Sequence, residues 1–302
     1  MASHYRALHT VGHWGCCTAL STFLLEIGTE ELPADFARLA LPQLEQLVRR
    51  DLSEARLCFG TIQCTSTPRR LVLRIDALAA AAADLQEDRK GPPAAQAFKD
   101  GVATQAAIGF ANRCGVAPEA LEVRDTPKGP FVFARVLEPG RRADALLQEC
   151  IPQWIGSLQG RRFMRWGEGD SRFSRPVRWL VALLDDRVIT TRLEGADPVI
   201  TAGNVSRGHR LISDAVPIRS AETYADSLQQ AGVLVERDSR ASFIRQGIDQ
   251  AAAALQARPD LPDDLFDELI DLVESPQLIE GSIEERYLAL PAEVLSTVMR
   301  AH

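Results

Sequence analysis

Arginines alternate with aromatic side chains through residues 163–179, and this pattern offers the strongest chemistry in the sequence. It reads Phe-Met-Arg-Trp-Gly and then Arg-Phe-Ser-Arg-Pro-Val-Arg-Trp. Aromatic faces stack on unpaired bases and guanidinium groups neutralise phosphates, so the pattern indicates an RNA-facing surface. The alternative is that Trp166 and Trp179 are core residues among solvated arginines, and Trp179 is expected in the core because it opens an apolar run. The arginines assigned to RNA are Arg165, Arg172 and Arg175.

Two shorter segments also carry side chains that bind anions. Residues 67–70, Thr-Pro-Arg-Arg, place two guanidinium forks on a turn, where they would match phosphate oxygens or pair with acids of a neighbouring helix. Residues 204–210, Asn-Val-Ser-Arg-Gly-His-Arg, form either a loop of donors around an RNA phosphate or a structural loop whose histidine bonds to backbone. The candidate RNA contacts from these two segments are Arg69, Arg70, Arg207, His209 and Arg210.

The sequence lacks the motifs of nucleotide and hydrolytic enzymes. There is no GxxxxGK[ST] loop, GxGxxG, GxSxG or HExxH. Apart from the terminal histidine, only His209 lies inside the apparent fold, so no catalytic residue is assigned. The six cysteines form no CxxC pair, and we expect no metal site. A leader site is the alternative, with ligands His4, His9, His13, Cys16 and Cys17.

Composition and charge limit the kinds of partner that the chain can bind. The chain has 302 residues, 46% of them hydrophobic, and a net charge of -7, so any RNA contact must come from a local patch. Residues 160–180 hold six arginines against two acids, whereas residues 259–293 hold eleven acids and one arginine. We expect the acidic residues 260–285 to face solvent or a protein partner. No apolar stretch reaches the length of a membrane span, and the cysteines indicate reduced thiols in the cytoplasm.

Periodicity and turn signals predict an α+β fold with mixed or antiparallel sheets and packed helices. Apolar runs predict strands at 23–27, 61–65, 71–75, 131–136, 177–184, 188–193 and 279–283. Helical spacing predicts helices at 34–52, 94–99, 104–114, 143–158, 221–231, 238–255, 262–274 and from 291. Lys-Gly-Pro-Pro at 90–93 predicts a break. The stripe Phe243, Ile244, Ile248 and Leu255 is expected to be core.

The same signals divide the chain into four segments. The predicted segments are a disordered leader at 1–21, a small α/β unit at 22–85, an α+β unit at 86–218, and a helix-rich continuation at 219–302. The last predicted helix meets no glycine, proline or polar run that would end it, so we expect the final segment to be truncated.

Nine colinear segments resemble one family. Leu-Glu-Ile-Gly-Thr-Glu-Glu-Leu-Pro at 25–33 is similar to the opening signature of bacterial glycyl-tRNA synthetase beta subunits, and Thr-Pro-Arg-Arg-Leu at 67–71 to the next marker. The others lie at 90–98, 128–129, 163–167, 173–179, 207–210, 272–276 and 290–295. The resemblance runs from residue 23 to the end. Residues 1–21 depart from the pattern, and family members are roughly twice as long or more.

The resemblance implies a function for the chain as a subunit. The family's enzyme attaches glycine to tRNA(Gly) with ATP and Mg, as a tetramer of two alpha and two beta subunits. Its catalytic core lies on the alpha subunit, and the beta subunit binds tRNA. The N-terminal region is similar in fold to the editing-type module of the phenylalanyl-tRNA synthetase beta subunit. We therefore expect tRNA and the alpha subunit as partners, and neither DNA nor membrane. The alternatives are a stand-alone RNA-binding or tRNA-editing module, or an inactive fragment.

Overall fold

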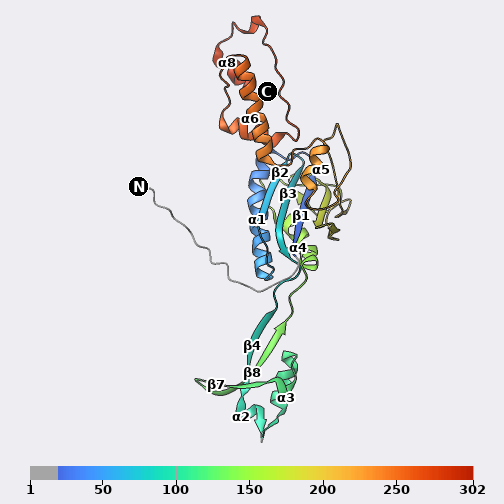
Figure 1. Cartoon of the computed structure of the whole chain (residues 1–302), viewed down its shortest axis with the longest axis vertical. Helices are drawn as coiled ribbons and strands as arrows, with labels where there is room; N and C mark the ends of the chain where they lie inside the picture. The colour runs from blue at the N-terminus through green and yellow to red at the C-terminus, as the bar shows by residue number, and fades with distance from the viewer. Residues whose placement is uncertain (1–19, 100, 302) are drawn as a thin grey trace, which may run out of the picture.

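A central antiparallel sheet organises the protein, which is described by a computed structural model at residues 20–99 and 101–301. An arm built on two long strands extends from one end of this sheet and a helical segment from the other (Figure 1). The α+β class is confirmed. The predicted leader metal ligands lie outside the described residues.

Five strands form the central sheet in the order β12-β11-β1-β3-β2, with antiparallel neighbours. They are β1 (Leu20–Thr29), β2 (Ile62–Thr67), β3 (Arg70–Ala79), β11 (Val177–Leu184) and β12 (Arg187–Val188). The strands predicted at 23–27, 61–65, 71–75 and 177–184 are confirmed. The partner predicted at 188–193 is mostly wrong, because only β12 pairs with β11. The chain then leaves the sheet, and β13 (Arg192–Leu193) pairs with β14 (Ile200–Thr201).

Both faces of this sheet are covered, which explains why its strands read as continuous apolar runs. Phe23, Leu25 and Ile27 point to the face that packs against α1 (Ala34–Glu54) and α4 (Ala143–Ser157). These helices were expected at 34–52 and 143–158, and both are confirmed. Side chains on the opposite face, including Leu24, Val72 and Val181, pack against residues 216–235. That segment contains β16 (Val216–Pro217) and α5 (Tyr224–Gln230), and β15 (Val205–Ser206) pairs with β16.

The arm is a small unit with its own apolar core. Its elements are β4 (Leu85–Pro93), α2 (Ala94–Ala97), β5 (Phe98–Lys99), β6 (Val102–Ala103), α3 (Gln105–Cys114), η1 (Pro118–Ala120), β7 (Glu122–Thr126) and β8 (Gly129–Glu138). The break predicted at 90–93 is wrong in position, because β4 continues to Pro93. A register shift between Lys90 and Pro93 leaves the prolines on an edge strand beside a bulge, where a missing N–H is tolerated.

The C-terminal segment is helical. It contains α6 (Arg237–Ala254), α7 (Asp263–Leu272), η2 (Glu285–Tyr287) and α8 (Ala292–Ala301). The apolar stripe predicted as core on α6 is wrong: Phe243 and Leu255 are 50% and 65% exposed. Ile244 and Ile248 are only partly buried, and the fully buried side chain of α6 is Arg240. Residues 279–283 form no strand. Within the described ranges, no helix is long and apolar enough to cross a membrane.

Candidate nucleic-acid interface

Three residues form a row across the second face of the sheet. The registers place Gly28 of β1 opposite Arg70 of β3 on one side and Trp179 of β11 on the other. The indole of Trp179 lies against Gly28, where an added Cβ would fall 1.9 Å from a ring carbon. Glycine is therefore required at this position, and the glycine in the 25–33 signature has a packing reason.

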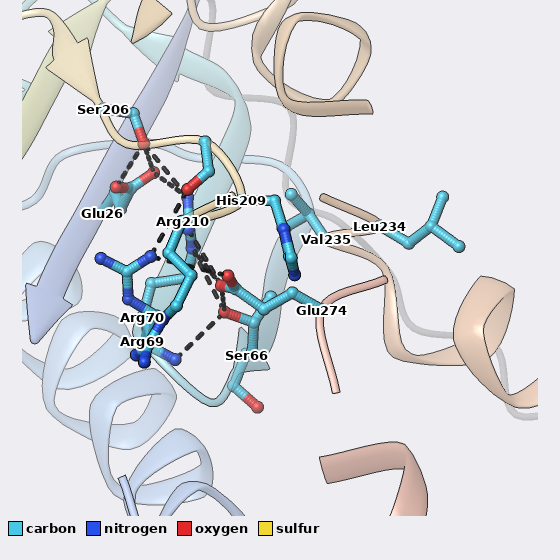
Figure 2. Close-up of polar contacts among 12 residues, drawn as sticks. Glu26, Ser66, Arg69, Arg70, Ser206, His209, Arg210, Leu234, Val235 and Glu274 are labelled. Carbon is cyan, nitrogen blue, oxygen red and sulfur yellow. Dashed lines mark hydrogen bonds and ion pairs between the residues drawn. The ribbon is translucent and has the colours of Figure 1, made fainter. Parts of the chain in front are cut away.

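Glu26 is the centre of a buried polar network below this row. Its side chain has no exposed area. Trp179 Nε1, Tyr224 Oη and Ser206 Oγ all donate hydrogen bonds to its carboxylate, and Arg70 Nη1 lies 3.8 Å from Oε2. Burial raises the pKa of the Tyr224 phenol, and the Glu26 carboxylate raises it further. Tyr224 therefore remains a neutral donor. Figure 2 shows Ser206 above Glu26 in this network.

Arg70 joins Glu26 to a second carboxylate from the C-terminal segment. Arg70 Nη2 donates to Glu274 Oε1 at 2.9 Å (Figure 2), and Thr67 Oγ1 donates to the same oxygen. Burial opposes the charged form, but the carboxylates of Glu26 and Glu274 outweigh it and raise the pKa of Arg70. The expectation that Arg70 contacts RNA is corrected, because its side chain is fully buried between these two acids.

A second buried arginine, Arg240, ties the helical segment to the sheet. It donates at 2.7–3.0 Å to the backbone carbonyls of Ser66, Leu234, Val235 and Ile270. Burial lowers the pKa of Arg240 to about 10. Carbonyl dipoles, not a facing carboxylate, satisfy its donors, and no local sequence signal marks this role.

Two acids of the segment expected to face solvent or a partner are instead buried. Asp271 and Glu274 are 5% and 6% exposed. Arg38 and Arg237 pair with Asp271 at 3.2 and 2.9 Å, as Arg70 pairs with Glu274. The expectation overlooked basic partners from α1, β3 and α6 that lie far away in the sequence.

Arg69 and Arg207 gather at the edge of the buried network, beside Trp179. Their guanidinium carbons lie 5.6 and 5.1 Å from the Trp179 ring. Arg69 is mostly buried. Burial lowers the pKa of Arg69, and the Glu274 carboxylate 4.0 Å away offsets only part of this effect. Arg207 is exposed. Trp179 itself is 8% exposed, which confirms it as a core residue.

The remaining residues of this loop are held by the protein itself. His209 is partly buried. Its backbone N–H donates to Ala231 O at 2.9 Å, and its ring Nδ1 accepts a hydrogen bond of 3.5 Å from the backbone N–H of Leu211. These contacts match the structural alternative for His209. Arg210 is exposed and forms an ion pair with Glu31.

The other three candidates lie on or beside a short hairpin. β9 (Met164–Arg165) pairs with β10 (Arg172–Phe173), so that Arg165 and Arg172 are opposite each other, and both are exposed. The turn of the hairpin packs on residues 195–197, where Glu168 N donates to Asp197 Oδ2 at 2.8 Å. Arg175 follows β10, is partly buried, and donates to Ser174 O at 2.8 Å. The eight candidates thus separate into a Trp179 cluster and a hairpin cluster.

An open cleft lies against the hairpin cluster, with a volume of about 1020 Å³. Its lining includes Arg172, three further arginines at 161, 162 and 192, and the aromatic side chains of Phe163 and Trp166. Among the described residues, no group of three or more His, Cys, Asp or Glu side chains could hold a metal ion. The fold and these surfaces define an α+β protein whose exterior carries clusters of arginine suited to anions.

Comparison with known proteins identifies the family. Residues 23–302 match the model of the glycyl-tRNA synthetase beta subunit. The chain is 45% identical over 284 residues to the glycine–tRNA ligase beta subunit of Picosynechococcus sp. and 44% identical to that of Synechocystis sp.. Each alignment covers 94% of this chain, which spans about 40% of the length of these relatives. The chain belongs to the glycyl-tRNA synthetase beta subunit family.

Proposed function

We propose that this chain contributes tRNA binding and subunit assembly to a glycyl-tRNA synthetase. The observation that carries the proposal is the pair of exposed arginines, Arg165 and Arg172, opposite each other on a hairpin beside an arginine-lined cleft. Arginines opposite each other on a hairpin can present their guanidinium groups to successive phosphates of an RNA backbone. Arg175 lies beside this hairpin, and Arg207 and Arg210 form a second exposed group near Arg69, whereas Arg70 belongs to the interior.

The rest of the assignment follows from the family. The relatives are named glycine–tRNA ligase beta subunit, which supports an alpha subunit as the partner. In the proposed enzyme, two alpha and two beta subunits attach glycine to tRNA(Gly) in the cytoplasm. ATP and Mg act on the alpha subunit, and neither DNA nor a membrane is a partner. The finer likeness of this N-terminal region to the editing-type module of phenylalanyl-tRNA synthetase is part of the same proposal.

A salt titration tests the RNA-binding role. tRNA(Gly) binding by this chain is measured from low to physiological salt, with and without added alpha subunit. Replacing Arg172 and Arg175 together by alanine weakens binding and reduces the salt slope by about 0.7–0.9 for each phosphate that the variant no longer neutralises. The matched control is Arg141→Ala with Arg187→Ala, which removes two exposed charges elsewhere.

Three outcomes are distinguishable. A smaller slope in the first variant alone supports the proposal. Equal affinity and slope for both variants and the wild type would remove the hairpin cluster from the RNA surface. A folded chain that binds no tRNA(Gly), with or without the alpha subunit, would refute the RNA-binding role itself.

A further inference from the structure

The cleft beside the hairpin has the dimensions of a ligand site. It lies between the end of α4, residues 158–163, the β9–β10 hairpin and residues 192–195. Its volume of about 1020 Å³ is at the upper end of the range for sites that enclose small organic ligands. A nucleotide fits within such a volume.

One wall of the cleft is aromatic and rigidly supported. The Phe163 ring packs on Phe36 and Phe173, with centroids 5.9 and 5.8 Å away. Gly160 makes this packing possible, since a Cβ there would lie 2.5 Å from the Phe163 ring. Trp166 packs against the same core and remains partly exposed. Fixed rings of this kind form a platform for a base without a large entropy cost.

The Nε1 atom of Trp166 is buried and has no acceptor among the described residues. Because this atom has almost no exposed area, Trp166 offers a ligand in the cleft its ring face and not its N–H group.

The lining of the cleft is also cationic. Four arginines line it against two acids, Asp170 and Glu194. Exposed ion pairs occupy Arg161 with Asp35 at 3.7 Å and Arg192 with Glu194 at 3.5 Å. Within the described part of the chain, Arg162 and Arg172 form no ion pair, so their charge is available to an incoming anion.

We propose that this cleft binds one unpaired nucleotide of an RNA, with its base against Trp166 and Phe163 and its phosphate on Arg162 and Arg172. The inference rests on the proposed RNA-binding function and adds that the RNA element read here is single-stranded. A base inside a duplex offers no face to an aromatic ring, so helical RNA cannot make the same contacts.

The test uses the 302-residue chain and a six-nucleotide single-stranded RNA, compared with a blunt duplex of the same sequence. Trp166→Leu weakens binding of the single strand about 5- to 150-fold, which is the range for losing one stacked base. Trp166→Phe keeps a smaller aromatic stacking face, and its affinity lies between those of the wild type and Trp166→Leu. Arg141→Ala is the matched surface control and leaves the affinity unchanged.

Because Trp166 touches the core, a second variant keeps the proposal falsifiable. Arg162→Ala with Arg172→Ala alters exposed side chains only and also weakens single-strand binding. Unchanged binding in both the tryptophan and the arginine variants overturns the cleft as a nucleotide site. Equal affinity for duplex and single strand overturns the single-stranded assignment. If tRNA(Gly) does not bind but the hexamer binds in a Trp166-dependent way, the proposed function fails and the cleft stands.

Discussion

Arg70 holds two carboxylates in a place that water does not reach. Glu26 approaches it from its own sheet, and Glu274 approaches from the segment after α7. Such a triad is held by mutual pairing, because each charge is expensive to bury alone. Neutral donors from Trp179, Ser206 and Tyr224 complete the coordination of Glu26. The network holds the Trp179 ring in place, and the exposed Arg207 and the mostly buried Arg69 lie against that ring.

Breaking this triad should destabilise the fold. Arg70→Met keeps the aliphatic length but leaves Glu26 without a cation and Glu274 with Arg69 alone, 4.0 Å away, so we expect the free energy of unfolding to fall by about 3–5 kcal/mol. Urea denaturation measures it. Arg74→Met is the control on the same strand, because the Arg74 pair with Asp76 is more than one-third exposed and should contribute little. Equal losses in the two variants would contradict the role of the triad.

Burial makes the thiol of Cys64 a slow nucleophile. It raises the pKa of Cys64 to about 12, with a further contribution from Glu45. At pH 8.5 we expect iodoacetamide, followed by mass spectrometry, to label exposed Cys58 before Cys64, and urea to abolish the difference. The folded chain retains the Cys64 proton that the unfolded chain loses, so this group's stability contribution falls as the pH rises from about 9 to 12. Rapid labelling of native Cys64 would refute the assignment.

At the scale of elements, the close contact between β1 and β11 depends on one missing side chain. Gly28→Ala forces the Trp179 indole away from the sheet and from Glu26. We expect the free energy of unfolding, measured by urea denaturation, to fall by about 1–3 kcal/mol, and the tryptophan emission to shift to the red. Gly109→Ala in α3 meets no atom within 4 Å and should be neutral or stabilising. A neutral Gly28→Ala would show that the sheet adapts at no cost.

Local periodicity predicted several elements correctly even where their partners lie far away in the sequence. β1, α1, β3, α3, α4 and β11 were predicted because apolar side chains repeat at strand or helix spacing. The prediction that the apolar stripe on α6 is core failed because helical periodicity identifies an apolar face but does not show whether another element covers it. The strand expected at 279–283 failed because an apolar run gains strand geometry only beside another strand.

The candidate site was predictable as a set of residue types but not as contacts. The arginines and their aromatic neighbours were visible in the sequence, and Trp179 was correctly expected in the core. Arg70 and Glu274 are 204 residues apart, and no local pattern shows that they meet. Glu26 carried a missed signal, because a single acid inside a continuous apolar run indicates a buried charge with a partner.

At the scale of the whole molecule, the arm is connected to the body by two chain crossings. β4 and β8 pair along most of their length, from Leu85 opposite Glu138 to Pro93 opposite Phe131. The arm's core is separate from the two cores of the body. Its buried members are Ala97, Ala107, Phe110, Cys114, Val132 and Ala134. The arm projects away from the sheet in Figure 1, so it contributes little to the packing of the body.

The body should therefore keep its stability when the arm is removed. Replacing residues 86–137 by a short Gly–Ser linker leaves both body cores intact, and we expect the main thermal transition to shift by less than about 4 °C, equivalent to roughly 1 kcal/mol. Val132→Asp complements this deletion, because it buries an unpaired carboxylate in the arm alone. Hydrogen exchange should then show lost protection in residues 85–138 and native protection in β1 and β3. A large fall in the temperature of the main transition after either change would mean that arm and body fold as one cooperative unit. A loss of RNA binding in an arm variant would then reflect unfolding of the body that carries the cleft.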